Sequence, residues 1–152
     1  MEFKTKKLRN LQIAMVMMGV LSFTSCGDIE EPDGKWDPMV WHAEVPTDWQ
    51  NNAFVVDANG EEFTFSCKNY SKPWLYDAQY AGEYYHPIVE DNEYHTIDWH
   101  TISLDWFKAE IKDNQLKVTF DANLQTEERP IKLTVTAGDI FYTFNFKQSA
   151  SK

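Results

Sequence analysis

The chain has 152 residues, with 24 Asp and Glu against 14 Lys and Arg, and therefore a formal net charge of −10 at pH 7. A surface this acidic repels phosphate backbones and anionic lipid headgroups, so we expect no nucleic-acid binding and no direct adhesion to a membrane surface. With only two cysteines, Cys26 and Cys67, the fold is not one held together by a disulfide framework.

The N-terminal segment has the composition of a secretory signal. Four basic residues precede a short apolar stretch that is too short to span a bilayer as a helix: Lys4, Lys6, Lys7 and Arg9. The ending Phe23-Thr24-Ser25-Cys26 resembles a bacterial lipobox, whose cysteine becomes the lipidated first residue of the mature protein. We predict a lipoprotein signal peptide at 1–25, lipidation of Cys26, and export to the outer membrane or cell surface. The alternatives are an ordinary cleaved signal and a short retained anchor.

The segment after Cys26 is acidic, contains proline and lacks hydrophobic periodicity. This composition predicts a flexible tether over 26–48, with one folded domain over 49–152. The lipid on Cys26 would be the only membrane attachment. Because lipidation uses the Cys26 thiol, Cys67 is left without a disulfide partner. Cys67 follows Phe63 and Phe65 at period two, so we expect a buried, inert thiol.

The first predicted strands surround an Asn-Gly pair. Residues 54–57 are mostly apolar, and residues 62–67 alternate between polar and apolar side chains. Asn59-Gly60 lies between the two stretches. Asn-Gly supplies the positive φ angles of a tight two-residue turn, so this stretch predicts a β-hairpin. Thr64 and Ser66, with Lys68, are expected on its solvent face.

Residues 69–104 are less regular and rich in aromatic, histidine and acidic side chains. We predict strands at 74–76 and 100–104, followed by another at 105–111. The connection between the first two is long for a β-sandwich, and long loops often carry function.

The strongest signal lies in the last third of the chain. Alternation with period two places three sets of apolar side chains on one face of successive strands: Leu116, Val118, Phe120; Ile131, Leu133, Val135; and Ile140, Tyr142, Phe144, Phe146. The glycine-containing connection 137–139 suits a hairpin. The sequence therefore predicts an all-β, immunoglobulin-like β-sandwich of about 6–8 antiparallel strands.

These strands also resemble a known family. The run from Trp106-Phe107 through LKVTFDAN and Arg129 to FNFKQ resembles the C-terminal half of BACON domains, and ANGEEFTFSCKN followed by Trp74 resembles their first strands. The resemblance covers 54–148 and implies an immunoglobulin-like module associated with glycan use in Bacteroidetes. It implies structural roles for Asn123, Arg129, Gly138 and Gln148, and carries over no sugar-binding residues.

An aromatic cluster in the long loop is the candidate ligand site. Flat aromatic faces stack on the C–H face of a sugar ring, and neighbouring carboxylates and amides bind hydroxyls. The candidate glycan-binding residues are Trp74, Tyr76, Tyr80, Tyr84, Tyr85, Tyr94 and Trp99, with Asp77, Gln79, Glu83 and Asn92 as polar partners. The alternative is that these aromatic side chains only close the open ends of the sandwich.

No spacing in the chain matches a zinc site, a calcium loop or a nucleophile motif. His86, His95 and His100 lie among acidic residues without metal-ligand spacing. We therefore expect no enzyme, no metal and no cofactor. The expected function is a non-enzymatic, cell-surface or periplasm-facing lipoprotein that is associated with carbohydrate and binds glycan weakly through the aromatic loop. The alternative is a spacer or accessory module that contacts another outer-membrane protein.

Overall fold

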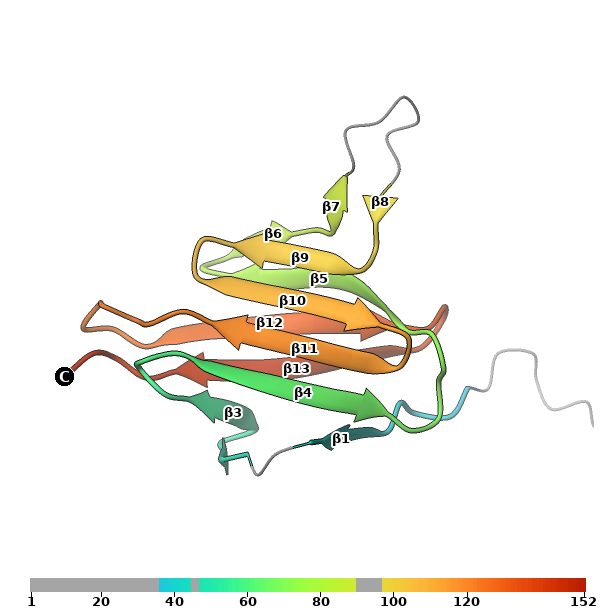
Figure 1. Cartoon of the computed structure of the whole chain (residues 1–152), viewed down its shortest axis with the longest axis horizontal. Helices are drawn as coiled ribbons and strands as arrows, with labels where there is room; N and C mark the ends of the chain where they lie inside the picture. The colour runs from blue at the N-terminus through green and yellow to red at the C-terminus, as the bar shows by residue number, and fades with distance from the viewer. Residues whose placement is uncertain (1–35, 45–46, 90–96) are drawn as a thin grey trace, which may run out of the picture. The chain divides into compact units, whose positions relative to one another are not determined.

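The alternating strands of the sequence form two β-sheets that pack face to face (Figure 1). The structure is a computed structural model that describes residues 36–44, 47–89 and 97–152. The predicted signal peptide at 1–25, Cys26 and Tyr94 lie outside these residues. The described residues contain no helix, and hence no helix long and apolar enough to cross a membrane. The predicted all-β, immunoglobulin-like sandwich is confirmed.

The first sheet has five antiparallel strands in the order β1-β4-β11-β10-β9. Their bounds are β1 Trp41–Ala43, β4 Glu61–Cys67, β9 Thr101–Leu104, β10 Phe107–Lys112 and β11 Gln115–Phe120. The turn at Asp113 and Asn114 joins β10 to β11, which pair along their whole length.

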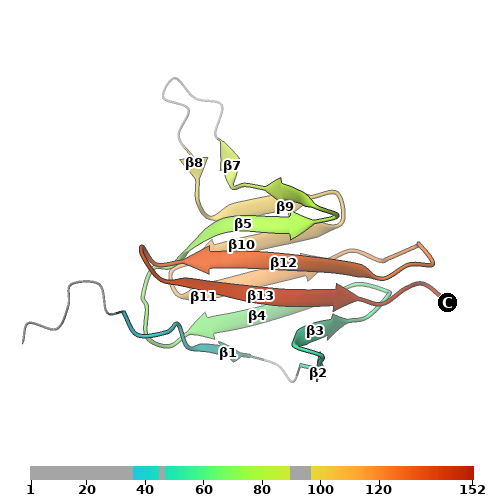
Figure 2. The ribbon, with the colours of Figure 1, turned by 180° about the vertical axis from the view of Figure 1, so that it is seen from behind.

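The second sheet has six strands in the order β2-β3-β13-β12-β5-β6 and is seen from its outer side in Figure 2. Their bounds are β2 Trp49–Gln50, β3 Ala53–Val56, β5 Trp74–Tyr80, β6 Glu83–Tyr85, β12 Arg129–Thr136 and β13 Phe141–Gln148. All pairs are antiparallel except β3 with β13. The hairpin predicted around 137–139 is confirmed as β12–β13. A separate ribbon of β7 (Ile88–Val89) and β8 (Ile97–Asp98) projects beyond the sandwich.

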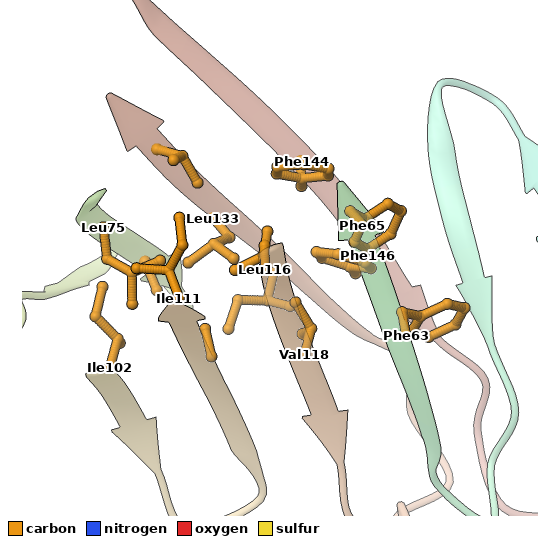
Figure 3. Close-up of a cluster of buried hydrophobic side chains, with 14 of the residues drawn as sticks. Phe63, Phe65, Leu75, Ile102, Ile111, Leu116, Val118, Leu133, Phe144 and Phe146 are labelled. Atoms are coloured by element: carbon orange, nitrogen blue, oxygen red, sulfur yellow. The ribbon is translucent and has the colours of Figure 1, made fainter. Parts of the chain in front are cut away.

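The core lies between the sheets, where phenylalanines from β4 and β13 meet (Figure 3). The ring centroids of Phe65 and Phe144 are 4.8 Å apart, and those of Phe63 and Phe146 are 5.9 Å apart. Each of these four side chains is 1% exposed. The predicted inner residues of β11 and β12 are buried beside them: Leu116, Val118, Phe120, Ile131, Leu133 and Val135.

The hairpin predicted at Asn59-Gly60 is wrong. The turn exists, with the Gly60 N–H donating to the Asp57 carbonyl at 3.1 Å, but β3 and β4 belong to different sheets. An Asn-Gly pair reverses the chain locally without requiring its flanking strands to pair with each other. Here β3 pairs with β13 and β4 pairs with β11, so the turn carries the chain across the sandwich.

The end of the predicted tether is also part of the fold. Within 26–48, Trp41–Ala43 pairs with β4, Met39 is 5% exposed, and the Trp41 ring lies 5.2 Å from that of Phe144. Burying these apolar side chains favours order over a flexible linker. Ser66, expected to face solvent, is instead buried, because its hydroxyl donates to the Glu44 carboxylate just beyond β1.

Two strand boundaries differ from the prediction. Trp106 lies in the turn between β9 and β10, and the strand begins at Phe107. The strand predicted at 74–76 continues to Tyr80. The number of strands exceeds the predicted 6–8, because edge strands of two or three residues are too short to show a period in sequence.

A network of amide hydrogen bonds closes one end of the sandwich. The Asn123 Nδ2 donates to the carbonyls of Glu127 (2.8 Å) and Ser149 (2.9 Å), and the Gln148 Nε2 donates to the Asp121 carbonyl (2.7 Å). The Arg129 guanidinium lies 4.9 Å from the centre of the Trp106 ring. These contacts confirm that the side chains of Asn123, Gln148 and Arg129 have structural roles.

Gly60 should be the least replaceable glycine of the fold. Its φ is +92°, and an added Cβ would collide with the Phe120 carbonyl oxygen, whereas Gly138 (φ +94°) has open space around it. The left-handed conformation alone should cost Gly138→Ala roughly 1–2 kcal/mol of unfolding free energy. Gly60→Ala should lose a further 1–3 kcal/mol, roughly, from the collision. Urea denaturation of both variants measures this, and equal losses would contradict the close approach.

Candidate functional site

Strand β5 presents the first part of the aromatic cluster. Its pairing with β12 shifts between Thr134 and Val135, which makes Tyr76 the extra residue of a β-bulge. Leu75 and Ala78 are fully buried in the core. Trp74 pairs with Thr136 on the opposite, outer face of the sheet. The bulge therefore exposes Tyr76 without disturbing the core positions before and after it.

The hairpin from β5 to β6 directs three tyrosines in two directions. Tyr85 pairs with Ala78 and packs against the core, whereas Tyr84 pairs with Gln79 on the outer face and is 59% exposed. Tyr80 also turns inward, with its ring 5.0 Å from that of Trp106 in an edge-to-face arrangement. Tyr80 and Tyr85 therefore close the edge of the sandwich, as the packing alternative expected.

Tyr76 has an aromatic partner that the loop-centred prediction did not include. Its ring lies 5.2 Å from that of Phe141 on β13, edge to face, and both side chains are about half exposed, at 45% and 51%. The available signal was the alternation of the last strand, which puts Phe141 on the solvent face, where a polar residue is usual.

Trp74 and Trp99 line one groove. The Leu75 N–H donates to the Trp99 carbonyl at 2.9 Å, which fixes the β8–β9 connection beside the start of β5. The groove has a volume of about 310 Å³. It is lined by Lys72, Pro73, Trp74, Trp99, His100 and Asp113. Trp99 is 41% exposed, so an aromatic face is accessible at its rim.

Asp98 holds the turn that carries Trp99. Its carboxylate accepts hydrogen bonds from the His100 backbone N–H (3.1 Å) and contacts the His100 Nδ1 at 2.9 Å. Partial burial raises the pKa of Asp98, but hydrogen bonds from His100 and Thr101 outweigh it and lower the pKa below its usual value. The ionised carboxylate therefore stabilises the turn above the unfolded-state pKa, and this contribution is lost as pH falls through the folded-state pKa.

The structure thus divides the predicted cluster. Trp74 and Trp99 share a groove, Tyr76 pairs with Phe141, Tyr84 stands alone on the outer face, and Tyr80 and Tyr85 are packed. Of the expected polar partners, Asp77 is 9% exposed, while Glu83 and Gln79 are more accessible. Asn92 lies outside the described residues. The seven aromatic residues do not form one flat strip, because strand alternation turns neighbours to opposite faces.

The described part of the chain contains no group of three or more His, Cys, Asp or Glu side chains that could bind a metal. His86 is exposed, His100 contacts Asp98, and His95 lies outside the described ranges. Cys67 is a buried free thiol, 3.7 Å from the Asn69 Oδ1.

Alanine substitutions at Tyr85 and Tyr84 should differ in their effect on stability, because Tyr85 is packed and Tyr84 is exposed. Tyr85→Ala should lower the unfolding free energy by about 1–3 kcal/mol, because its ring packs on the core. Tyr84→Ala, one residue away on the same strand, should change it by no more than about 0.5 kcal/mol. Thermal or urea denaturation compares the two variants. A larger loss for Tyr84→Ala would reverse the assignment of faces.

Comparison with known proteins finds a related protein among the solved structures. No protein-family model and no curated protein matches the chain. Among solved structures, the NMR structure of a protein from Bacteroides thetaiotaomicron is 32% identical in sequence, with a TM-score of 0.63. The match covers 80% of this chain and 95% of the Bacteroides chain. The chain therefore belongs to the same family as this Bacteroides thetaiotaomicron protein.

Proposed function

We propose that the protein is a non-enzymatic, lipid-anchored module of the outer membrane or cell surface that binds glycan through the Trp74–Trp99 groove. The observation that carries this proposal is the placement of two tryptophans on one groove, Trp74 on β5 and Trp99 in the β8–β9 connection, which a backbone hydrogen bond joins to β5. An indole face desolvates the C–H face of a sugar ring on contact. Lys72, His100 and Asp113 offer hydrogen-bonding groups to its hydroxyls.

Two further observations support the proposal. The strands from 54 to 148 resemble BACON domains, which are associated with carbohydrate handling. The structural relative comes from Bacteroides thetaiotaomicron, a member of the bacterial group in which those domains occur. An open groove with few polar groups buries only part of a ligand, so the expected affinity is weak.

The second candidate is a spacer or accessory module that contacts another outer-membrane protein. The packing of Tyr80 and Tyr85 favours it, because these loop aromatics stabilise the sandwich and are not available to a ligand. This candidate needs no sugar binding at the groove.

Substituting the exposed tryptophan should abolish glycan binding. In affinity electrophoresis through gels containing plant, host or microbial polysaccharides, Trp99→Ala should remove the retardation of the wild-type protein. A tenfold loss of affinity corresponds to about 1.4 kcal/mol, within the reach of one aromatic contact. The matched control is Trp49→Ala, which removes a 50% exposed tryptophan on β2, at the opposite edge of the six-stranded sheet from β5 and β6.

Denaturation curves should show that Trp99→Ala keeps the fold. Retardation that survives in folded Trp99→Ala contradicts the proposed groove. Absence of retardation for the wild type on all three glycan sources favours the spacer.

The lipid anchor is tested separately from sugar binding. In a bacterial host that processes lipoproteins, Cys26→Ser should shift the protein from the membrane to the soluble fraction, because no other part of the acidic chain is expected to hold it there. Membrane partition and the intact mass of the product measure this. A Cys26→Ser protein that stays with the membrane shows that the anchor lies elsewhere.

A further inference from the structure

A second groove lies on the outer face of the six-stranded sheet, towards the other end of β5 from Trp74. It has a volume of about 480 Å³, and strands β5, β12 and β13 form its floor. The β2–β3 turn, with Asn51 and Asn52, and the β5–β6 turn, with Ala81 and Gly82, border it. No Asp or Glu lines it, although acidic residues outnumber basic ones by 24 to 14 in the chain.

The strand register aligns four side chains across this face. Tyr84 pairs with Gln79, Gln79 pairs with Lys132, and Lys132 pairs with Asn145. Paired residues on adjacent strands point to the same face, about 4.8 Å apart. The row therefore runs roughly 14 Å across β6, β5, β12 and β13, a length suited to an oligosaccharide. The row begins with the exposed aromatic ring of Tyr84. The Gln79 amide, the Lys132 ammonium group and the Asn145 amide follow in that order.

Lys132 is the cation available in this groove. Among the ion pairs of the described residues, the other groove lysine, Lys147, binds Glu128 at 2.8 Å, and Lys132 takes part in none. By strand register, the carboxylate closest to Lys132 on this face is that of Asp77. Asp77 lies on β5 two residues before Gln79, opposite Thr134, and is 9% exposed. The groove therefore offers an entering anion the Lys132 ammonium group, and no carboxylate is among its lining residues.

The chemistry of the row indicates its ligand. An ammonium group binds a carboxylate or sulfate, amide side chains both donate to and accept from hydroxyls, and an aromatic face stacks on a sugar ring. The net negative charge of the protein opposes a polyanion at long range. At physiological ionic strength, however, charges more than about 8 Å apart are largely screened, so the groups in the groove dominate.

We propose that this groove is a second, anion-selective saccharide site. Lys132 binds the acidic group of the sugar, Gln79 and Asn145 bind its hydroxyls, and Tyr84 stacks on a ring at the edge of the sheet. The inference builds on the proposed association with glycans and adds a substrate class, the acidic saccharides. It uses a different groove from Trp99, so the two proposals can fail independently.

The test compares an acidic oligosaccharide with its neutral ester. Isothermal titration of the full-length protein in detergent uses an oligogalacturonate and the same oligosaccharide with its carboxylates methyl-esterified, which keeps the rings and removes the charge. The wild type should bind the acid at least tenfold more tightly than the ester. Lys132→Gln should abolish this preference, and Tyr84→Ala should weaken binding of both ligands.

Two variants serve as controls. Lys117→Gln removes the same charge from β11 of the five-stranded sheet, where the Lys117 ammonium group forms an ion pair with the Glu62 carboxylate at 2.9 Å, and should leave the preference unchanged. Trp99→Ala should also leave it unchanged. Equal binding of acid and ester, no binding of the acid, or an unaltered preference in Lys132→Gln would each overturn the second site. Loss of neutral-glycan binding in Trp99→Ala with intact oligogalacturonate binding supports both sites.

Discussion

The packing of Phe63 and Phe65 on β4 against Phe144 and Phe146 on β13 is the contact on which the rest of the fold depends. It joins the two sheets through aromatic rings that are almost fully excluded from water. Burial of such rings is the main favourable contribution in a domain without a disulfide. It also recruits Trp41, whose ring meets Phe144, so the segment before the domain gains a strand that its own composition did not predict.

Committing the inner faces to this core restricts where ligands can bind. A ligand can contact only the side chains that point away from the core. On the outer face of the six-stranded sheet these include Trp74, Tyr84 and the Gln79–Lys132–Asn145 row. Both grooves involve β5, whose bulge at Tyr76 changes which side chains face outward between them. A rigid sheet holds these side chains more firmly than a loop would, which lowers the entropy cost of any binding at this face.

The amide network at one end of the sandwich serves stability rather than recognition. Asn123 and Gln148 satisfy backbone carbonyls where strands end, and Gly60 allows the crossing turn to approach the end of β11. Unpaired buried carbonyls are costly, so these amides are needed wherever the strands leave the sheet. These residues therefore account for the closed end of the sandwich, where the strands leave the sheets.

The sequence by itself determined the all-β class, the inner faces of β11, β12 and β13 and the hairpin between the last two strands, because alternation with period two is a local property. It also identified Trp74 and Trp99 as candidate site residues. Only the tertiary structure decided that Asn59-Gly60 joins different sheets, that Tyr80 and Tyr85 pack inward, and that Lys132 lies between Gln79 and Asn145. Strand partners and register depend on contacts between residues distant in sequence, which no local pattern encodes.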